Sequence, residues 1–187
     1  LAGRPERFCA GFDLKVLTGG GPDGPRLLRS GFETSVRLLS YPRPVVVACT
    51  GHAFAMGAFL LLSGDHRFGV AGGDHRITAN EVAIGMTMPR TAIEICRQRL
   101  TRAHFERAVL LAEVFDPAGA VAAGFLDELV PGEQLLEAAR AKAAALMELN
   151  LSALAATKAR ARAATLDAMR AAIEADDAEF TALLGGR

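Results

Sequence analysis

The feature that most constrains the fold is an apolar, mostly β-branched run at residues 45–49, Val-Val-Val-Ala-Cys. Such a run is typical of a parallel strand that is covered on both faces. We interpret the small residues at 51–57 as a turn, and the sequence Ala-Phe-Leu-Leu-Leu at 58–62 predicts a buried helix. A buried strand that leads into a buried helix indicates a layered α/β fold.

The rest of the chain divides into two parts of different composition. Further candidate strands are at 67–71 and 76–78, and candidate amphipathic helices are at 26–40 and 89–100. Beyond about residue 100 the chain is rich in Ala, Leu, Arg and Glu, which is a helical composition. We therefore predict an α/β domain over residues 1–130, followed by a helical region over 131–187.

The C-terminal helices carry apolar faces beside Arg-rich ones. The apolar positions include Leu166, Met169, Ile173 and Phe180. Such a face packs either on a neighbouring subunit or on its own domain, and the pattern alone does not separate these alternatives. Because tails of this kind commonly join subunits, we expect a homo-oligomer.

Composition excludes several classes of protein. The 187 residues include 21 basic and 21 acidic ones, so a nucleic-acid partner held mainly by charge is not expected. Hydrophobic residues make up 51% of the chain, enough for a packed core, but no apolar run approaches the roughly 20 residues that span a bilayer. The three cysteines follow no disulfide or zinc pattern, so we predict no metal site and a cytoplasmic protein.

Two glycine-flanked segments are candidates for chemistry, at residues 8–14 and 48–58. Small residues let a ligand approach the backbone, and the start of a helix leaves N–H groups without partners. Two such turns that face one point would form an oxyanion hole with two donors, which stabilises an enolate. The alternative is that both segments are simply tight turns.

These segments also resemble the motifs of a known family. Phe-Cys-Ala-Gly-Phe-Asp-Leu at 8–14, Thr-Gly-His-Ala-Phe-Ala-Met-Gly-Ala at 50–58 and Asn-Glu-Val-Ala-Ile-Gly-Met at 80–86 are similar, in order and spacing, to successive motifs of the crotonase (enoyl-CoA hydratase/isomerase) superfamily. The closest similarity is to its mycobacterial EchA-type branch. The resemblance covers essentially the whole chain, and by this resemblance the family's first strands and helix are missing from it.

The resemblance implies an α/β fold, a crotonase-like ββα spiral with a C-terminal helical trimerisation region. It also implies a homotrimer or hexamer and an acyl-CoA substrate of fatty acid metabolism. No cofactor is expected beyond the coenzyme A of the substrate itself. The family's two oxyanion donors map to the backbone N–H groups of Phe12 and Met56, with Gly11 and Gly57 beside them in the substrate-binding turns. Met56 is bulkier than the usual glycine but keeps its N–H.

One departure from the family pattern bears on the reaction. Hydratases of this family use two glutamates, and the corresponding positions here are Phe59 and Glu81. A single carboxylate suits a shuttle that removes and returns one proton, and burial would raise its pKa enough to make it a useful base. We therefore expect double-bond isomerisation of fatty enoyl-CoA thioesters rather than efficient hydration, which is a lyase reaction. The alternatives are a solvated surface role for Glu81 and a non-catalytic acyl-CoA-binding protein.

Other polar residues have weaker assignments. The resemblance suggests that Lys15 and Lys158 bind the phosphates of coenzyme A, although either could be an ordinary solvated lysine. His52 could replace the missing acid or be a hydrogen-bonded turn histidine. Thr87, Met88 and Arg90 lie where the family has its acyl-pocket loop, so we expect a pocket of different shape.

Overall fold

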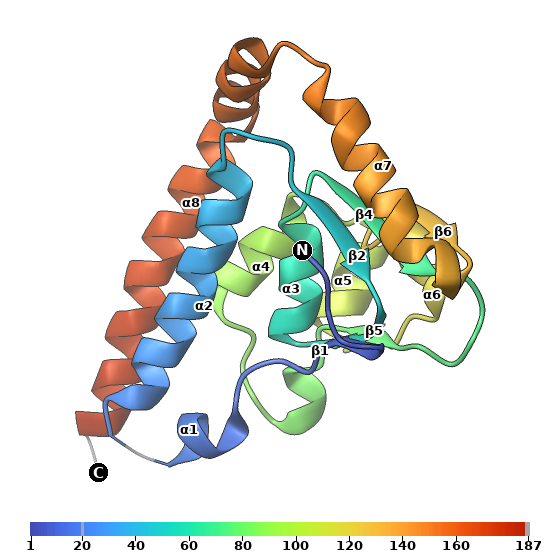
Figure 1. The fold of residues 1–187 in the computed structure, drawn as a ribbon. Coiled ribbons are helices and arrows are strands. Elements are labelled where there is room, and N and C mark those ends of the chain that lie inside the picture. Colours follow the sequence, from blue (N-terminus) through green and yellow to red (C-terminus); the bar gives the residue numbers. More distant parts are fainter. Residues whose placement is uncertain (20, 186–187) are drawn as a thin grey trace.

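The computed structural model describes residues 1–19 and 21–185, which fold into two parallel three-stranded sheets and the helices around them (Figure 1). One sheet has the order β1 (Glu6–Cys9), β3 (Gly51–Phe54), β5 (Ile77–Thr78). The other has the order β2 (Val46–Cys49), β4 (His66–Val70), β6 (Glu128–Val130). All four strand pairings are parallel.

The helices connect and cover these sheets. They are α1 (Leu14–Thr18), α2 (Asp23–Ser40), α3 (Met56–Leu62), α4 (Arg90–Arg97), α5 (Arg102–Val109), α6 (Pro117–Ala123), α7 (Leu135–Met147) and α8 (Leu151–Gly185), with short 3-10 helices at Val82–Ile84 and Gly132–Gln134. Strands and helices are interspersed up to β6, and the described region after it is helical. The predicted α/β architecture with a helical C-terminal region is confirmed.

The prediction of a turn over 51–57 is wrong, because its first four residues form strand β3. A Cβ atom at Gly51 would lie 2.0 Å from the carbonyl carbon of Glu6, so glycine is needed for the close approach of β1 to β3. The small residues therefore mark a strand between two neighbours. The turn itself is confined to Ala55, and α3 begins directly after it.

The prediction that β2 is covered on both faces is confirmed. Val47 and Cys49 belong to the main core, which also contains residues of α2, α3, α4 and α8. Val46 and Ala48 point to the other side, where they pack with Phe68 and with residues of α7. In Figure 1, α7 lies across β2 and β4 on the side away from α8.

The long helix α8 packs along α2 and α4 of its own chain (Figure 1). Its apolar residues Leu166, Met169 and Ile173 are buried there. Of the two alternatives for this face, the structure shows packing on its own domain, so the face gives no support to the expected oligomer, which stays a prediction. Among the described residues, no helix combines the length and apolar character required to cross a bilayer.

Candidate active site

The three motif segments follow or contain the ends of β1, β3 and β5, which lie at the same edge of one sheet. Cys9 pairs with Ala53, Ala53 with Ile77, and Phe54 with Thr78, so β1, β3 and β5 end side by side. In Figure 1, β1 and β5 lie in the lower half of the molecule, and α1 lies below and to the left of them. The carboxyl edge of a parallel sheet is where α/β proteins bind ligands, and here it carries all three motif segments.

The first two turns are in contact at Gly11. Gly11 has φ +95°, and a Cβ atom there would lie 3.0 Å from the Cβ of Ala55 and 3.8 Å from the backbone N of Met56. Met56 is the first residue of α3, so its N–H has no acceptor inside the helix. Phe12 directly follows Gly11. The structure therefore brings the turn that carries Phe12 against the turn that carries Met56.

Ala55 holds the second turn in a strained conformation. Its φ of 49° and ψ of −120° cost a non-glycine residue roughly 1–3 kcal/mol. The backbone is fixed on both sides, because Ala55 N–H donates to Thr78 O at 3.0 Å and Ala55 O accepts from Ala58 N–H at 2.9 Å. Such strain is typical of functional turns, and here it sets the position of Met56.

Around the two turns, side chains are used for packing. The Phe12 ring meets the Phe32 ring edge-on at 6.0 Å, and the Met56 side chain is buried. A Cβ atom at Gly57 would lie 2.3 Å from Cys9 O, so glycine lets the end of β1 pack against the start of α3. What Phe12 and Met56 can offer to a ligand is therefore their backbone N–H groups.

Glu81 supplies a buried carboxyl group beyond the end of β5. The residue is 5% exposed, and its Oε2 has no hydrogen-bond partner among the described residues. Burial raises the pKa of Glu81 to about 7. Its carbonyl oxygen accepts from Met86 N–H at 2.9 Å, which fixes the backbone. A solvated surface role is therefore wrong, and the carboxyl can both accept and donate a proton near neutral pH.

Comparison with known proteins agrees with this arrangement. The family model described as enoyl-CoA hydratase/isomerase matches residues 1–185. The chain belongs to the enoyl-CoA hydratase/isomerase family. The resemblance noted in the sequence, including that to the mycobacterial EchA-type branch, is thereby confirmed.

Solved structures and curated relatives give the extent of the similarity. The enoyl-CoA hydratase EchA3 from Mycobacterium ulcerans Agy99 is 52% identical with a TM-score of 0.91, over 96% of this chain and 78% of that one. An enoyl-CoA isomerase of Mycobacterium tuberculosis is 51% identical with a TM-score of 0.88, over 93% of this chain and 76% of that one. The rat mitochondrial enoyl-CoA delta isomerase 1 is 29% identical over 97% of this chain and 63% of its own length. The chain thus spans about three fifths of the curated relatives.

Phe59, which the sequence resemblance sets at the position of the hydratases' first glutamate, lies in the hydrophobic core, and its correspondence with that glutamate stays a prediction. It lies in α3, is 1% exposed and packs against Phe32 with ring centroids 6.4 Å apart. The position is part of the hydrophobic core, where an ionised carboxylate would be costly. The structure therefore shows Phe59 as a buried aromatic residue of the core.

Lys15 lies in α1, directly after the first turn, and is exposed. Its backbone N–H donates to the Oδ1 of Asp13 at 2.9 Å, so Asp13 caps α1. Lys15 is thus the second residue of α1, three residues after Phe12, and its role in binding coenzyme A stays a prediction.

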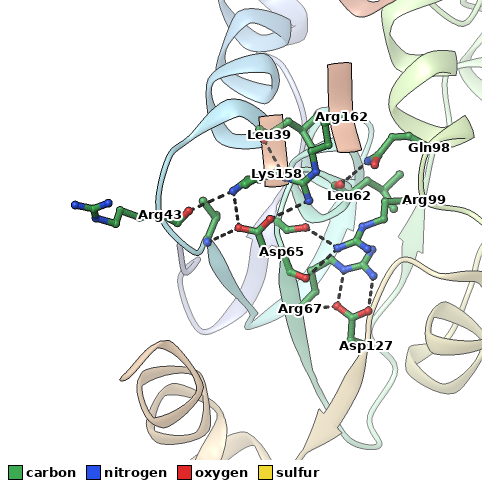
Figure 2. A network of polar contacts seen from close by, with 12 residues as sticks. Leu39, Arg43, Leu62, Asp65, Arg67, Gln98, Arg99, Asp127, Lys158 and Arg162 are labelled. Carbon is green, nitrogen blue, oxygen red and sulfur yellow. Dashed lines mark hydrogen bonds and ion pairs between the residues drawn. The ribbon is translucent and has the colours of Figure 1, made fainter. Parts of the chain in front are cut away.

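Lys158 lies apart from the two turns, in an ion pair with Asp65 (Figure 2). Its Nζ lies 2.6 Å from Asp65 Oδ2, and its side chain is 8% exposed. Asp65 also pairs with Arg162 at 2.8 Å and accepts from Val45 N–H at 2.7 Å. Asp65 follows the C-terminal end of α3, whereas Met56 is the first residue of that helix. Lys158, which pairs with Asp65, therefore lies at the opposite end of α3 from Met56 and apart from the other site residues. Its position gives no support to the predicted contact with coenzyme A, because the side chain is already used in an ion pair.

His52 has a structural environment. Its Nδ1 accepts from Arg76 N–H at 3.0 Å, and its ring stacks on Phe54 with centroids 5.6 Å apart. The His75 ring meets it edge-on at 5.7 Å. These contacts favour the hydrogen-bonded histidine over a replacement for the missing acid.

Proposed function

We propose that this chain moves the double bond of fatty 3-enoyl-CoA thioesters to the 2-position, with Glu81 as the proton carrier. The observation that carries the proposal is one buried carboxyl group whose Oε2 has no hydrogen-bond partner among the described residues and whose pKa is raised to about 7. It lies just beyond the sheet edge that also bears the Phe12 and Met56 turns. The pKa near 7 allows the group to act as base and then as acid without a second residue.

In the proposed mechanism, the thioester oxygen accepts hydrogen bonds from Phe12 N–H and Met56 N–H. The carboxylate of Glu81 removes a proton from C2, and the electrons move into a dienolate whose negative charge lies on the thioester oxygen. Fixed backbone donors stabilise this charge more than that of the ground state, which lowers the barrier. Glu81 then returns the proton to C4, so proton and charge balance at the end of the cycle.

Hydration places a different demand on the site. Adding water across the 2-enoyl double bond requires one group to activate water and another to protonate C2 in concert. In the correspondence that the sequence resemblance implies, Phe59 takes the place of one hydratase glutamate, and Phe59 is a buried core residue that can neither accept nor donate a proton. The relatives include proteins named hydratases and proteins named isomerases, and the single carboxylate favours the isomerase reaction for this chain.

The test compares two rates of the purified protein. The chain is expected to convert a 3-enoyl-CoA to the conjugated thioester at least about 100-fold faster, by kcat/KM, than it hydrates crotonyl-CoA; a general acid–base group contributes about 100–10,000-fold. The conjugated thioester is followed by ultraviolet absorbance. Faster hydration than isomerisation would contradict the proposal. Binding of acyl-CoA by calorimetry, with neither turnover nor proton exchange at C2, would identify a non-catalytic acyl-CoA-binding protein instead.

A further inference from the structure

Gly31 lies in the middle of α2, where glycine is less favourable than alanine because more backbone freedom is lost on folding. A Cβ atom at this position would lie 2.5 Å from Cζ of the Phe12 ring and 3.5 Å from Sδ of Met56. The first distance is far below van der Waals contact, so any side chain here would displace the ring. Glycine therefore lets the Phe12 ring rest directly on the backbone of α2.

Gly31 and the next residue of α2, Phe32, contact side chains from both turns. Gly31 lies against Phe12 of the first turn and against Met56, the first residue of α3. Phe32 meets the Phe12 ring edge-on at 6.0 Å and the Phe59 ring of α3 at 6.4 Å. Phe32, Met56 and Phe59 are at most 5% exposed, and close packing of this kind transmits displacements between neighbours. Helix α2 is thus a common support for the two residues whose backbone N–H groups are the proposed donors.

Helix α8 holds α2 from the other side. In Figure 1, α2 lies between α8 and α3, and it packs against both. Arg29 of α2 pairs with Glu174 of α8 at 2.6 Å. Asp176 of α8, which is 5% exposed, accepts from Arg90 N–H and Thr91 N–H at 3.0 Å and so ties α8 to the start of α4. Because α2 is fixed in this way, a side chain added at its inner face would displace the two turns rather than the helix.

We propose that Gly31 is a positioning residue, which sets the places of the two backbone N–H donors by letting the Phe12 ring pack on α2 beside Met56. The inference rests on the proposed function, in which these donors bind the thioester oxygen. Gly31 has no group to offer to a substrate, so its effect is exerted through Phe12 and Met56. A displacement of about 1 Å in a reacting geometry slows a reaction by about 100-fold, and the loss of one oxyanion donor lowers kcat by about 100–1,000-fold.

Gly31→Ala is expected to lower kcat for a 3-enoyl-CoA by about 100-fold, because the methyl group forces the Phe12 ring and its turn out of place. KM should change much less, since the donors stabilise the charge of the dienolate more than the neutral thioester. The pH at which activity levels off should stay the same, because Glu81 is untouched. Ser30→Ala, at the neighbouring exposed position of α2, is the matched control and should keep the kcat of the wild type. Urea denaturation checks that each variant is folded under the assay conditions.

Phe12→Leu removes the ring but keeps the N–H group. Alone it is expected to lower kcat by about tenfold, because the first turn loses its contact with α2. In the double variant Gly31→Ala/Phe12→Leu the methyl group has no ring to displace, so kcat should match that of Phe12→Leu and exceed that of Gly31→Ala. Wild-type kcat in Gly31→Ala, or losses that simply multiply in the double variant, would overturn the inference. If Gly31→Ala does not fold, Phe12→Leu decides, and an unchanged kcat in that variant overturns it.

The carbonyl stretch of bound hexanoyl-CoA, measured by infrared spectroscopy with the carbonyl carbon isotopically labelled, separates this inference from the proposed function. Hydrogen bonds to the thioester oxygen lower this frequency, so binding to the wild type should lower it, and the shift should be smaller in Gly31→Ala. If the wild type shows the shift but isomerises no substrate, the proposed function fails, and a smaller shift in the variant still supports the positioning role. No shift in the wild type, or an equal shift in Gly31→Ala, would overturn the inference.

Discussion

The Glu81→Gln variant is expected to isomerise 3-enoyl-CoA at least 100-fold, and up to about 10,000-fold, more slowly by kcat/KM than the wild type. Glutamine has the size of glutamate but cannot take a proton from C2. The backbone donors of Phe12 and Met56 are untouched, so the dissociation constant for a saturated acyl-CoA should change little. Glu133→Gln makes the same exchange at an exposed residue and is the matched control.

The raised pKa of Glu81 also predicts how pH acts. Because only the carboxylate accepts a proton, kcat/KM of the wild type should rise with pH and level off above about 7. In the unfolded chain glutamate ionises near 4.5, so between about pH 4.5 and 7 the unfolded state loses a proton that the folded state keeps. The free energy of unfolding of the wild type should therefore fall across this window by about 2–3 kcal/mol.

Glu81→Gln has no ionisable group at this position, so its free energy of unfolding should not fall across this pH window. The variant should therefore be more stable than the wild type at pH 8 and similar to it at pH 4. An inactive variant that is also more stable would show that chemistry, rather than folding, is lost. Urea denaturation at the two pH values measures the difference. Wild-type activity in Glu81→Gln would contradict the assignment of the proton carrier.

The second large effect concerns stability. Asp127→Ala is expected to lower the free energy of unfolding by about 3–5 kcal/mol, because it leaves a buried charge without its partner. Arg67 is 2% exposed, and Asp127 accepts from its backbone N–H at 2.9 Å and from its Nε at 2.8 Å (Figure 2). The remaining guanidinium contact in the structure is to Gly124 O. An uncompensated guanidinium in this position would face the nearby charge of Arg99.

Denaturation in urea at neutral pH measures this loss. Burial opposes ionisation of Asp127, but the hydrogen bonds and charge of Arg67 outweigh it and lower the pKa of the carboxyl. The stabilisation of the folded state by the Asp127–Arg67 ion pair is therefore complete above the ordinary aspartate pKa of 3.8 and is lost as the pH falls below it. In acid, the free energies of unfolding of Asp127→Ala and the wild type should converge. Asp167→Ala removes an exposed partner of Arg170 and should cost less than about 1 kcal/mol. A loss below 1 kcal/mol in Asp127→Ala would contradict the account of this ion pair.

The residues of the site could be predicted where local chemistry is distinctive. Close approach of two backbones allows almost no residue but glycine, so the roles of Gly11 and Gly57 could be predicted. Burial on both faces allows only apolar residues, so strand β2 could be predicted from its apolar run. Glu81 could be named from its motif, but its burial could not, since it depends on what packs over it. Strand β3 could not be predicted, because its small residues are typical of a turn. Their role in a strand is evident only when the positions of the neighbouring strands are known.

Most of the features that could not be predicted depend on contacts between residues distant in sequence. Nothing near Lys158 in sequence indicates Asp65 as its partner, and nothing near Asp176 indicates the start of α4, although both contacts fix α8. Ala55 gives no signal either, because a positive φ is normally marked by glycine. These features arise when helices and strands distant in sequence pack together, so a single sequence carries little trace of them.

The most direct test of the central claim follows one hydrogen atom. A 3-enoyl-CoA deuterated at C2 is converted in ordinary water, and the product is examined by mass spectrometry and NMR for deuterium at C4. Because the proposed proton carrier, Glu81, is a single buried carboxyl group, the label removed from C2 should appear at C4 in a substantial fraction of the product. A product that carries only solvent hydrogen at C4 would contradict proton transfer by a single shielded carboxyl group.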